Sequence, residues 1–320
     1  MPEPARGAGP SRRADVWTSA CADLCAISYD DPSRIPVAVP GLARTSGGSW
    51  SCIWGPARDA TDANLAFVAA CTAPNGALLR AVVVLRGTDI TRGDLLGDLK
   101  QVYEDLDVAH QRALPWQTPG GVAVAPGTLD GLETVAALVS GGRQLLTFVV
   151  ALLRGPAAAG APLLVTGHSL GGCLTTVVAP WLLQGLVRAG VAPQVVPVTF
   201  AAPTAGNAAF ASYFDALFRG SVRVQNPLDV VPRAWADLAS LADLYRQPCN
   251  IDANLVERAA IDVLREDLRL HGTTYAQPQT GTVVLAPRCA PGAQSWTAEL
   301  AWQHHIATYI AGLGTSPDAC

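Results

Sequence analysis

A single short stretch, VTGHSLGG at residues 165–172, constrains the fold more than any other part of the chain. It places Ser169 between Gly167 and Gly171, after an apolar run of strand length and before one of helix length. A serine so placed lies on a sharp strand-to-helix turn, whose neighbours two residues away cannot carry a bulky Cβ. The helix would direct its positive dipole end at the serine, with the Leu170 amide where an oxyanion forms. The stretch therefore predicts a nucleophile elbow.

Strands and helices alternate on both sides of this elbow. Strand-like runs at residues 161–167, 193–203 and 221–226 are separated by helix-like runs that end at Gly190 and at Phe218. This alternation is typical of a parallel sheet covered by helices. Further predicted elements are an N-terminal helix ending at DDP, two strands around the turn PNG, a long helix over 128–154 interrupted at Gly141-Gly142, a helix over 254–271, a strand over 280–287 and a last helix over 297–313.

Composition favours one large globular domain. Half of the 320 residues are hydrophobic and only 15% are charged, which is enough for a sizeable core. The net charge of -4 and the absence of a basic run argue against nucleic-acid binding. The longest apolar runs, 145–153 and 177–187, are too short to span a membrane. We expect a disordered tail over 1–13, a single domain over 14–314 with an insertion at about 238–270, and a C-terminal tail over 315–320.

The cysteines and the N-terminus bear on the cellular compartment. The eight cysteines are scattered and form no CxxC pair, so zinc or redox chemistry has no local support. Their even number permits disulfides, whereas the lack of a visible signal peptide argues for a reducing compartment. We therefore expect a location that is cytoplasmic or unknown, with export by a leaderless route as an alternative. Cys173 is expected to be a small buried residue.

A serine hydroxyl is a poor nucleophile without a base. The chain order of elbow-type hydrolases is serine, acid and then histidine, so three histidines beyond Ser169 are candidate bases: His271, His304 and His305. His168 is next to the serine, but the turn directs its side chain elsewhere, so we expect it to pack beside the site.

The acid should follow a strand between the serine and the histidine. Asp229, in RVQNPLDVVPR, lies just past the predicted strand over 221–226. A carboxylate there can hold the imidazole in the required tautomer and stabilise the imidazolium. Asp237 and Asp243 are rivals, but helix-like sequence follows both, so a capping or solvated role fits them better.

Five motifs, in order along the chain, resemble those of the fungal-type (class 3) lipases, which have the α/β-hydrolase fold. The similarity covers roughly residues 81–310. The elbow alone occurs in many hydrolases. The segment RVQNPLDVVPR, which we call the acid loop, is together with TFAAPTAGN much more specific to this family. The motifs are VVVLRGTD with the acidic GDLLGDL after it, VTGHSLGG, VTFAAPTAGNAAFASYF, RVQNPLDVVPR and WQHHIATYI.

The resemblance implies a role for each residue of a triad. Ser169 corresponds to the nucleophile and Asp229 to the acid. His304 corresponds to the base, because its spacing to Tyr309 matches bacterial members of the family. The neighbouring His305 stays open as the alternative base. The implied fold is a mostly parallel central sheet flanked by helices.

Other parts of the resemblance concern the surroundings of the triad. Thr88 corresponds to the residue that supplies the second oxyanion donor, and His271 falls where the family often has a non-catalytic histidine. Residues 89–106 fit either an amphipathic lid helix or an ordinary surface helix. The chain departs from the family in having FAAP at 200–203 instead of FGSP, and in the length between its acid and its base.

The predicted activity is that of a serine ester hydrolase, a lipase or esterase, that cleaves acyl glycerols or related lipid esters through an acyl-enzyme. No metal and no cofactor are implied. The expected partner is a lipid ester substrate, including at a lipid–water interface. The alternatives are a phospholipase or acyltransferase with the same triad, and a non-catalytic binding protein with the hydrolase fold.

Overall fold

The structure is a computed structural model that describes residues 15–42, 47–87, 102–104 and 106–314. The two predicted tails lie outside these residues, and so do Thr88 and most of the stretch interpreted as a lid. All the other residues proposed for the site are described.

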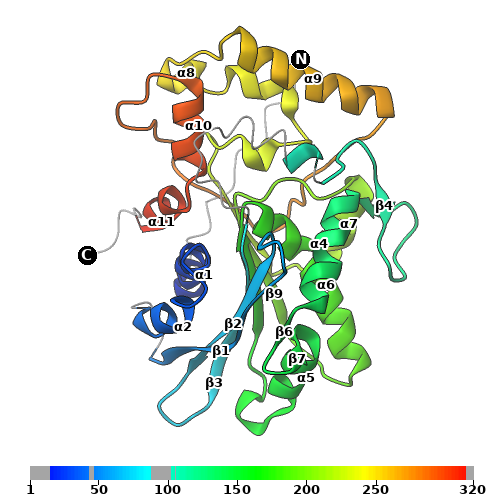
Figure 1. The fold of residues 1–320 in the computed structure, drawn as a ribbon, viewed down its shortest axis with the longest axis vertical. Helices are drawn as coiled ribbons and strands as arrows, with labels where there is room; N and C mark the ends of the chain where they lie inside the picture. The colour runs from blue at the N-terminus through cyan, green and yellow to red at the C-terminus, as the bar shows by residue number, and fades with distance from the viewer. Residues whose placement is uncertain (1–14, 43–46, 88–101, 105, 315–320) are drawn as a thin grey trace, which may run out of the picture.

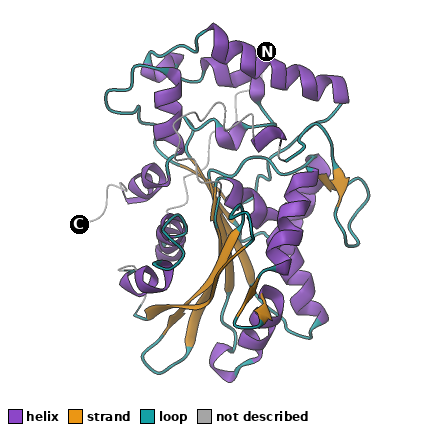
Figure 2. Cartoon of the chain, viewed as in Figure 1, coloured by secondary structure: helices purple, strands orange, loops and turns teal. Residues whose placement is uncertain are grey.

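A seven-stranded sheet forms the centre of the molecule (Figures 1 and 2). Its strand order is β1-β2-β3-β8-β9-β10-β11, and the pairing is antiparallel up to β3 and parallel from β3 to β11. The strands are β1 Ser49–Arg58, β2 Leu65–Thr72, β3 Leu78–Leu85, β8 Leu163–His168, β9 Val195–Phe200, β10 Val222–Gln225 and β11 Thr282–Val284. Two small hairpins pair β4 Arg112–Ala113 with β5 Ala123–Val124, and β6 Val139–Ser140 with β7 Arg143–Gln144.

Helices cover both faces of this sheet, so its central strands are near-continuous apolar runs. In Figure 1 one group of helices lies beside α1 and the other beside α6. The first group is α1 Val16–Ile27, α2 Ile35–Ala38, η1 Val39–Gly41 and α11 Ile306–Gly314. The second is α4 Pro126–Ala137, α5 Leu145–Arg154, η2 Pro156–Ala158, α6 Leu170–Arg188 and α7 Ala208–Leu217.

A third group of helices lies above the carboxyl ends of the parallel strands, and we call it the cap (Figure 1). It has an apolar core of its own, in which Leu228, Val230 and Val231 of the acid loop pack with Ile261 and other cap side chains. The loop that carries Asp229 is therefore part of the cap. The cap consists of η3 Val231–Arg233, η4 Leu238–Asp243, α8 Arg246–Cys249, α9 Leu255–His271 and α10 Trp296–His304.

One described helix, α6, is long and apolar enough to cross a membrane by length and composition. It is the helix of the predicted elbow, and 67% of its apolar window is buried inside the protein. Its hydrophobic character is therefore explained by its place against the central sheet.

The observed elements confirm the predicted α/β sheet and refine several boundaries. The long predicted helix is interrupted at Gly141-Gly142 by the β6–β7 hairpin, and the last predicted helix is divided at His305 into α10 and α11. Strand β1 was not predicted from the sequence. This strand contains the cis Gly55-Pro56 bond and irregular pairing with β2, and glycine and proline weaken the sequence signal of a strand.

Three backbones meet at the turn between β8 and α6. A Cβ on Gly167 would lie 2.2 Å from the carbonyl carbon and oxygen of Gly171. A Cβ on Gly171 would lie 2.2 Å from the carbonyl oxygen of Leu85 in β3. These glycines therefore allow the start of α6 to pack directly against two neighbouring strands.

The substitution Gly171→Ala should destabilise the protein. Alanine favours a helix by about 1 kcal/mol over glycine, but here its Cβ would collide with backbone that cannot rotate away. Overpacking of this kind costs about 1–3 kcal/mol. Urea unfolding should show a net loss, whereas Gly120→Ala, with no atom within 4 Å of the added Cβ, should stay close to the wild-type value. Equal stabilities of the two variants would contradict this account of the turn.

Candidate active site

Three polar side chains converge above the carboxyl ends of the parallel strands. Ser169 directly follows β8, Asp229 lies four residues after the end of β10, and His304 is the last residue of α10. Parallel neighbouring strands present their carboxyl ends at the same edge of the sheet, which brings the two loops together. All three side chains are buried.

The backbone of Ser169 is in a conformation that non-glycine residues rarely adopt, with φ 57° and ψ -129°. Such a conformation costs about 1–3 kcal/mol and persists only when its surroundings enforce it. The Ser169 amide donates to the carbonyl of Phe200 at 3.0 Å, and its own carbonyl accepts from the Cys173 amide at 3.1 Å. The strained serine is therefore held between the end of β9 and the first turn of α6.

His304 joins the other two side chains. Its Nδ1 lies 2.9 Å from Oδ2 of Asp229, and its Nε2 lies 2.9 Å from Oγ of Ser169. An ionised carboxylate only accepts hydrogen bonds, so Nδ1 carries the proton. The lone pair of Nε2 then faces the serine hydroxyl, which is the arrangement that a general base needs.

Asp229 is held by two further donors. Its Oδ1 accepts from the Val231 amide at 2.9 Å, and its Oδ2 accepts from the Tyr309 hydroxyl at 2.7 Å. Burial, and after it the negative charge of Asp229, raise the pKa of Tyr309 well above its usual value. The phenol therefore keeps its proton and donates a hydrogen bond to the Asp229 carboxylate.

His168 packs beside the site, as the sequence predicts. Its Nε2 lies 2.8 Å from the backbone carbonyl of His304, and its Nδ1 lies 2.8 Å from the hydroxyl of Tyr29. A carbonyl only accepts, so Nε2 donates and Nδ1 accepts from the tyrosine. Burial, followed by the nearby His304, lowers the pKa of His168 well below its usual value. His168 is thus a neutral link from the region after α1 to the backbone of His304.

The rival candidates make contacts with residues other than Ser169. His305 is exposed, and its Nδ1 accepts from the Ala307 amide. His271 is exposed at the end of α9, where its ring lies 5.0 Å from that of His110. Asp237 pairs with Arg233, and Asp243 pairs with Arg246 and Arg258.

The surroundings of the serine also include the predicted oxyanion donors. Leu170 is the first residue of α6, so its amide is one of those that receive no acceptor from within the helix. A Cβ on Gly87 would lie 3.2 Å from Cβ of Ser169, so the end of the Arg86-Gly87 segment runs beside the nucleophile. Thr88 itself lies outside the described residues.

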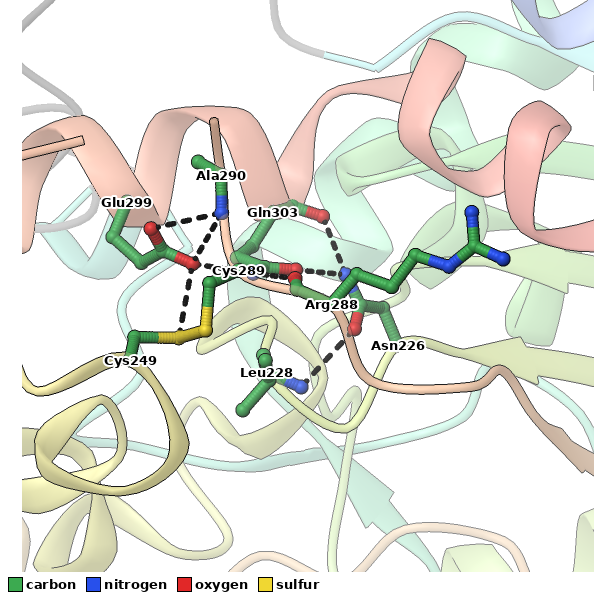
Figure 3. The surroundings of a disulfide bond; sticks show 8 residues. All are labelled: Asn226, Leu228, Cys249, Arg288, Cys289, Ala290, Glu299 and Gln303. Atoms are coloured by element: carbon green, nitrogen blue, oxygen red, sulfur yellow. Dashed lines mark hydrogen bonds between the residues drawn. A yellow bond between two sulfur atoms is a disulfide. The ribbon is translucent and has the colours of Figure 1, made fainter. Parts of the chain in front are cut away.

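A buried hydrogen-bond network connects the acid loop with the helix of the histidine (Figure 3). Asn226, three residues before Asp229, donates through Nδ2 to Oε1 and to the backbone carbonyl of Gln303, at 2.6 and 3.1 Å. Its Oδ1 accepts from the Leu228 amide at 3.1 Å. Gln303 directly precedes His304, so this network ties the acid and the base through their neighbours.

The same network continues to a disulfide bond between Cys249 and Cys289. Gln303 donates to Glu299 at 2.6 Å, and Glu299 accepts from the Ala290 amide with both carboxylate oxygens. Oε1 of Glu299 also contacts Sγ of Cys249 at 3.4 Å. The disulfide therefore holds the backbone at Cys289 and Ala290 next to α10.

The remaining described cysteines are free thiols, and Cys173 is buried as predicted. Disulfides are typical of oxidising environments, whereas a reducing compartment was predicted from the sequence. The compartment stays a prediction.

Comparison with known proteins identifies the family. Residues 82–238 match the family model described as lipase (class 3). The central part of the chain, residues 82–238, belongs to the class 3 lipase family. Over 91 residues the chain is 35% identical to lipase ZK262.3 of Caenorhabditis elegans, a stretch that covers 28% of this chain and 25% of that protein. The match thus spans about a quarter of the length of this curated relative.

Solved structures of lipases share the fold. M37 lipase superimposes with a TM-score of 0.76 and 24% identity, over 93% of this chain and 91% of its own. The triacylglyceride lipase of Rhizomucor miehei gives a TM-score of 0.50 and 21% identity, over 74% and 75% of the two chains. The N225Q mutant of MDLA from Penicillium cyclopium gives 0.51 and 15%, over 88% and 83%. Together with the mostly parallel sheet, these similarities show the α/β-hydrolase fold.

The neutral state of His168 predicts a loss of stability in mild acid. The folded chain keeps this ring neutral, whereas the unfolded chain protonates it below about pH 6.5, so acid favours unfolding. Stability should fall by up to about 1.4 kcal/mol per unit as the pH decreases from 6.5 to 5, and should be insensitive to this group above that range. Urea unfolding at several pH values should show a shallower dependence of stability on pH for His168→Gln than for the wild type, and equal slopes would contradict a neutral His168.

The double substitution Cys249→Ser/Cys289→Ser should destabilise the protein by about 3–5 kcal/mol, because the bond closes a loop with a sequence separation of 40. Urea unfolding without a reducing agent measures this loss. A reducing agent should lower the stability of the wild type and leave that of the double variant unchanged. A wild type as unstable as the variant before reduction would show that the bond does not form.

Proposed function

We propose that the chain is a serine ester hydrolase that cleaves acyl glycerols or related lipid esters through an acyl-enzyme. The observation that carries this proposal is the placement of His304, with one ring nitrogen 2.9 Å from the Ser169 hydroxyl and the other 2.9 Å from the Asp229 carboxylate. Membership of the class 3 lipase family supports lipid esters as the substrate class.

In the proposed reaction, Ser169 attacks the ester carbonyl while Nε2 of His304 removes its proton. Asp229 holds the ring in its tautomer and stabilises the imidazolium that forms. His304 then gives the proton to the departing alcohol, which leaves an acyl group on Ser169. Water, activated by the same histidine, cleaves the acyl-enzyme and releases the carboxylic acid.

Charge develops on the carbonyl oxygen of the substrate during both steps. The Leu170 amide, at the positive end of the α6 dipole, is the proposed donor among the described residues. The amide of Thr88 is proposed as the second donor, on the strength of the Arg86-Gly87-Thr88 motif. Each such donor is worth about 2.7–4 kcal/mol of transition-state stabilisation.

A matched pair of histidine variants tests the proposed roles. His304→Ala should lower kcat for a short p-nitrophenyl ester by about ten-thousandfold or more, because it removes the base that is hydrogen-bonded to the serine hydroxyl. His305→Ala, at the adjacent exposed position, should keep nearly wild-type activity. Loss of activity in His305→Ala together with retained activity in His304→Ala would show that His305, and not His304, is the base.

Labelling with a fluorophosphonate separates a hydrolase from a binding protein that merely has the same fold. The wild type should be labelled, and Ser169→Ala should not be. An unlabelled wild type that folds normally would refute covalent catalysis by this serine.

A further inference from the structure

The outer face of α9 exposes large aliphatic side chains in a row. The exposed fractions of Val256, Val263 and Leu270 are 75%, 63% and 68%. Residues seven apart lie two helical turns apart on nearly the same face, so these three side chains form one stripe. We call them the α9 stripe. Leu255, which is 86% exposed, adjoins its first residue.

The helix that presents this stripe is firmly anchored. Its opposite face buries Ile261, Leu264 and Leu268 in the core of the cap. Asn254 and Glu257 form a reciprocal capping box at its start, and Gly272 ends it in the left-handed conformation. The exposure of the stripe therefore does not result from a helix that is poorly packed.

The position of α9 relates the stripe to the reaction centre. Its buried face shares the cap core with Leu228, Val230 and Val231, which flank the acid Asp229 in sequence. In Figure 1 the helix runs across the end of the molecule above the carboxyl ends of the parallel strands. The family match ends at residue 238, so α9 lies outside the part of the chain that this match covers.

The charges beside the stripe are paired within the helix. Asp262 pairs with Arg265 at 2.8 Å, and Glu266 pairs with Arg269 at 2.6 Å. These four residues together contribute no net charge. Asp267, one turn after Val263, adds a carboxylate that accepts from the Tyr103 hydroxyl and lies 3.4 Å from Nδ1 of His271. The surroundings of the stripe therefore carry no excess of lysine or arginine from these residues. Such a surface matches a neutral lipid interface, whereas attraction to anionic lipids needs an excess of lysine and arginine.

We propose that the α9 stripe is the surface with which the chain docks on a neutral lipid–water interface. The proposal rests on the proposed lipid ester hydrolysis, because acyl glycerols with long chains collect in such interfaces. Docking buries the three side chains in the lipid and brings the catalytic end of the molecule close to its substrate.

A triple variant with a matched control tests the proposal. Val256→Ser/Val263→Ser/Leu270→Ser removes the stripe. The control Val37→Ser/Val139→Ser/Val187→Ser changes three side chains that are 78%, 56% and 59% exposed on α2, β6 and α6. Both sets of residues are exposed, so both variants should fold, which a thermal melt can check.

Two readouts separate docking from hydrolysis. Flotation with phosphatidylcholine vesicles should fall at least about tenfold in the stripe variant and stay unchanged in the control. The ratio of activity on emulsified triacylglycerol to activity on a soluble p-nitrophenyl ester should fall by a similar factor in the stripe variant alone. Wild-type flotation should persist in high salt and without phosphatidylserine.

The opposite results would overturn the proposal. Equal flotation of the stripe variant and the wild type would remove the stripe from docking. A wild-type dimer in light scattering that the stripe variant loses would show that a second copy covers this face. Flotation that requires phosphatidylserine would mean that a positively charged surface, and not the α9 stripe, binds the vesicles. A wild type that floats but does not cleave the soluble ester would refute the proposed hydrolysis and leave docking intact. A wild type that cleaves the soluble ester but does not float would refute docking alone.

Discussion

The pair of hydrogen bonds made by His304 is the constraint on which the rest of the site depends. When a buried imidazole bridges a buried hydroxyl and a buried carboxylate, the remaining oxygens of the carboxylate and of the histidine backbone also need hydrogen-bond donors. Val231 and Tyr309 supply donors to the carboxylate, and His168 supplies one to the backbone carbonyl of the histidine. The polar groups come from three separate segments of the chain, at residues 168–169, 229–231 and 304–309. The geometry of the site is therefore a property of the whole end of the sheet rather than of a motif.

Much of this arrangement could be predicted because its signals are local. The two glycines around Ser169 reflect sterics within one turn, and the apolar runs on either side reveal the strand and the helix directly. The parallel sheet followed from the alternation of such runs, and chain order narrowed the acid and base to a few residues. The structure brings together the serine, the acid and the histidine that the sequence favoured.

The parts that the sequence did not reveal depend on contacts between distant segments. Tyr29 meets His168 across 139 positions, and nothing in its neighbourhood marks it as part of a site. Gln303 could be seen beside a histidine, but its link to Asn226 needs the folded acid loop. The pairing of Cys249 with Cys289 is one of many that eight cysteines allow. The apolar core of the cap is formed by segments that, in the sequence, resemble unrelated loops and a surface helix.

The disulfide has a consequence for the covalent integrity of the cap. Cys249 and Cys289 lie on either side of α9, so the whole helix is contained in the loop that they close. A protease that cuts the backbone anywhere between these two cysteines would leave two polypeptides joined through sulfur. The nicked molecule would retain every atom of the cap in one covalent unit, and the cut would be visible on a gel only after reduction.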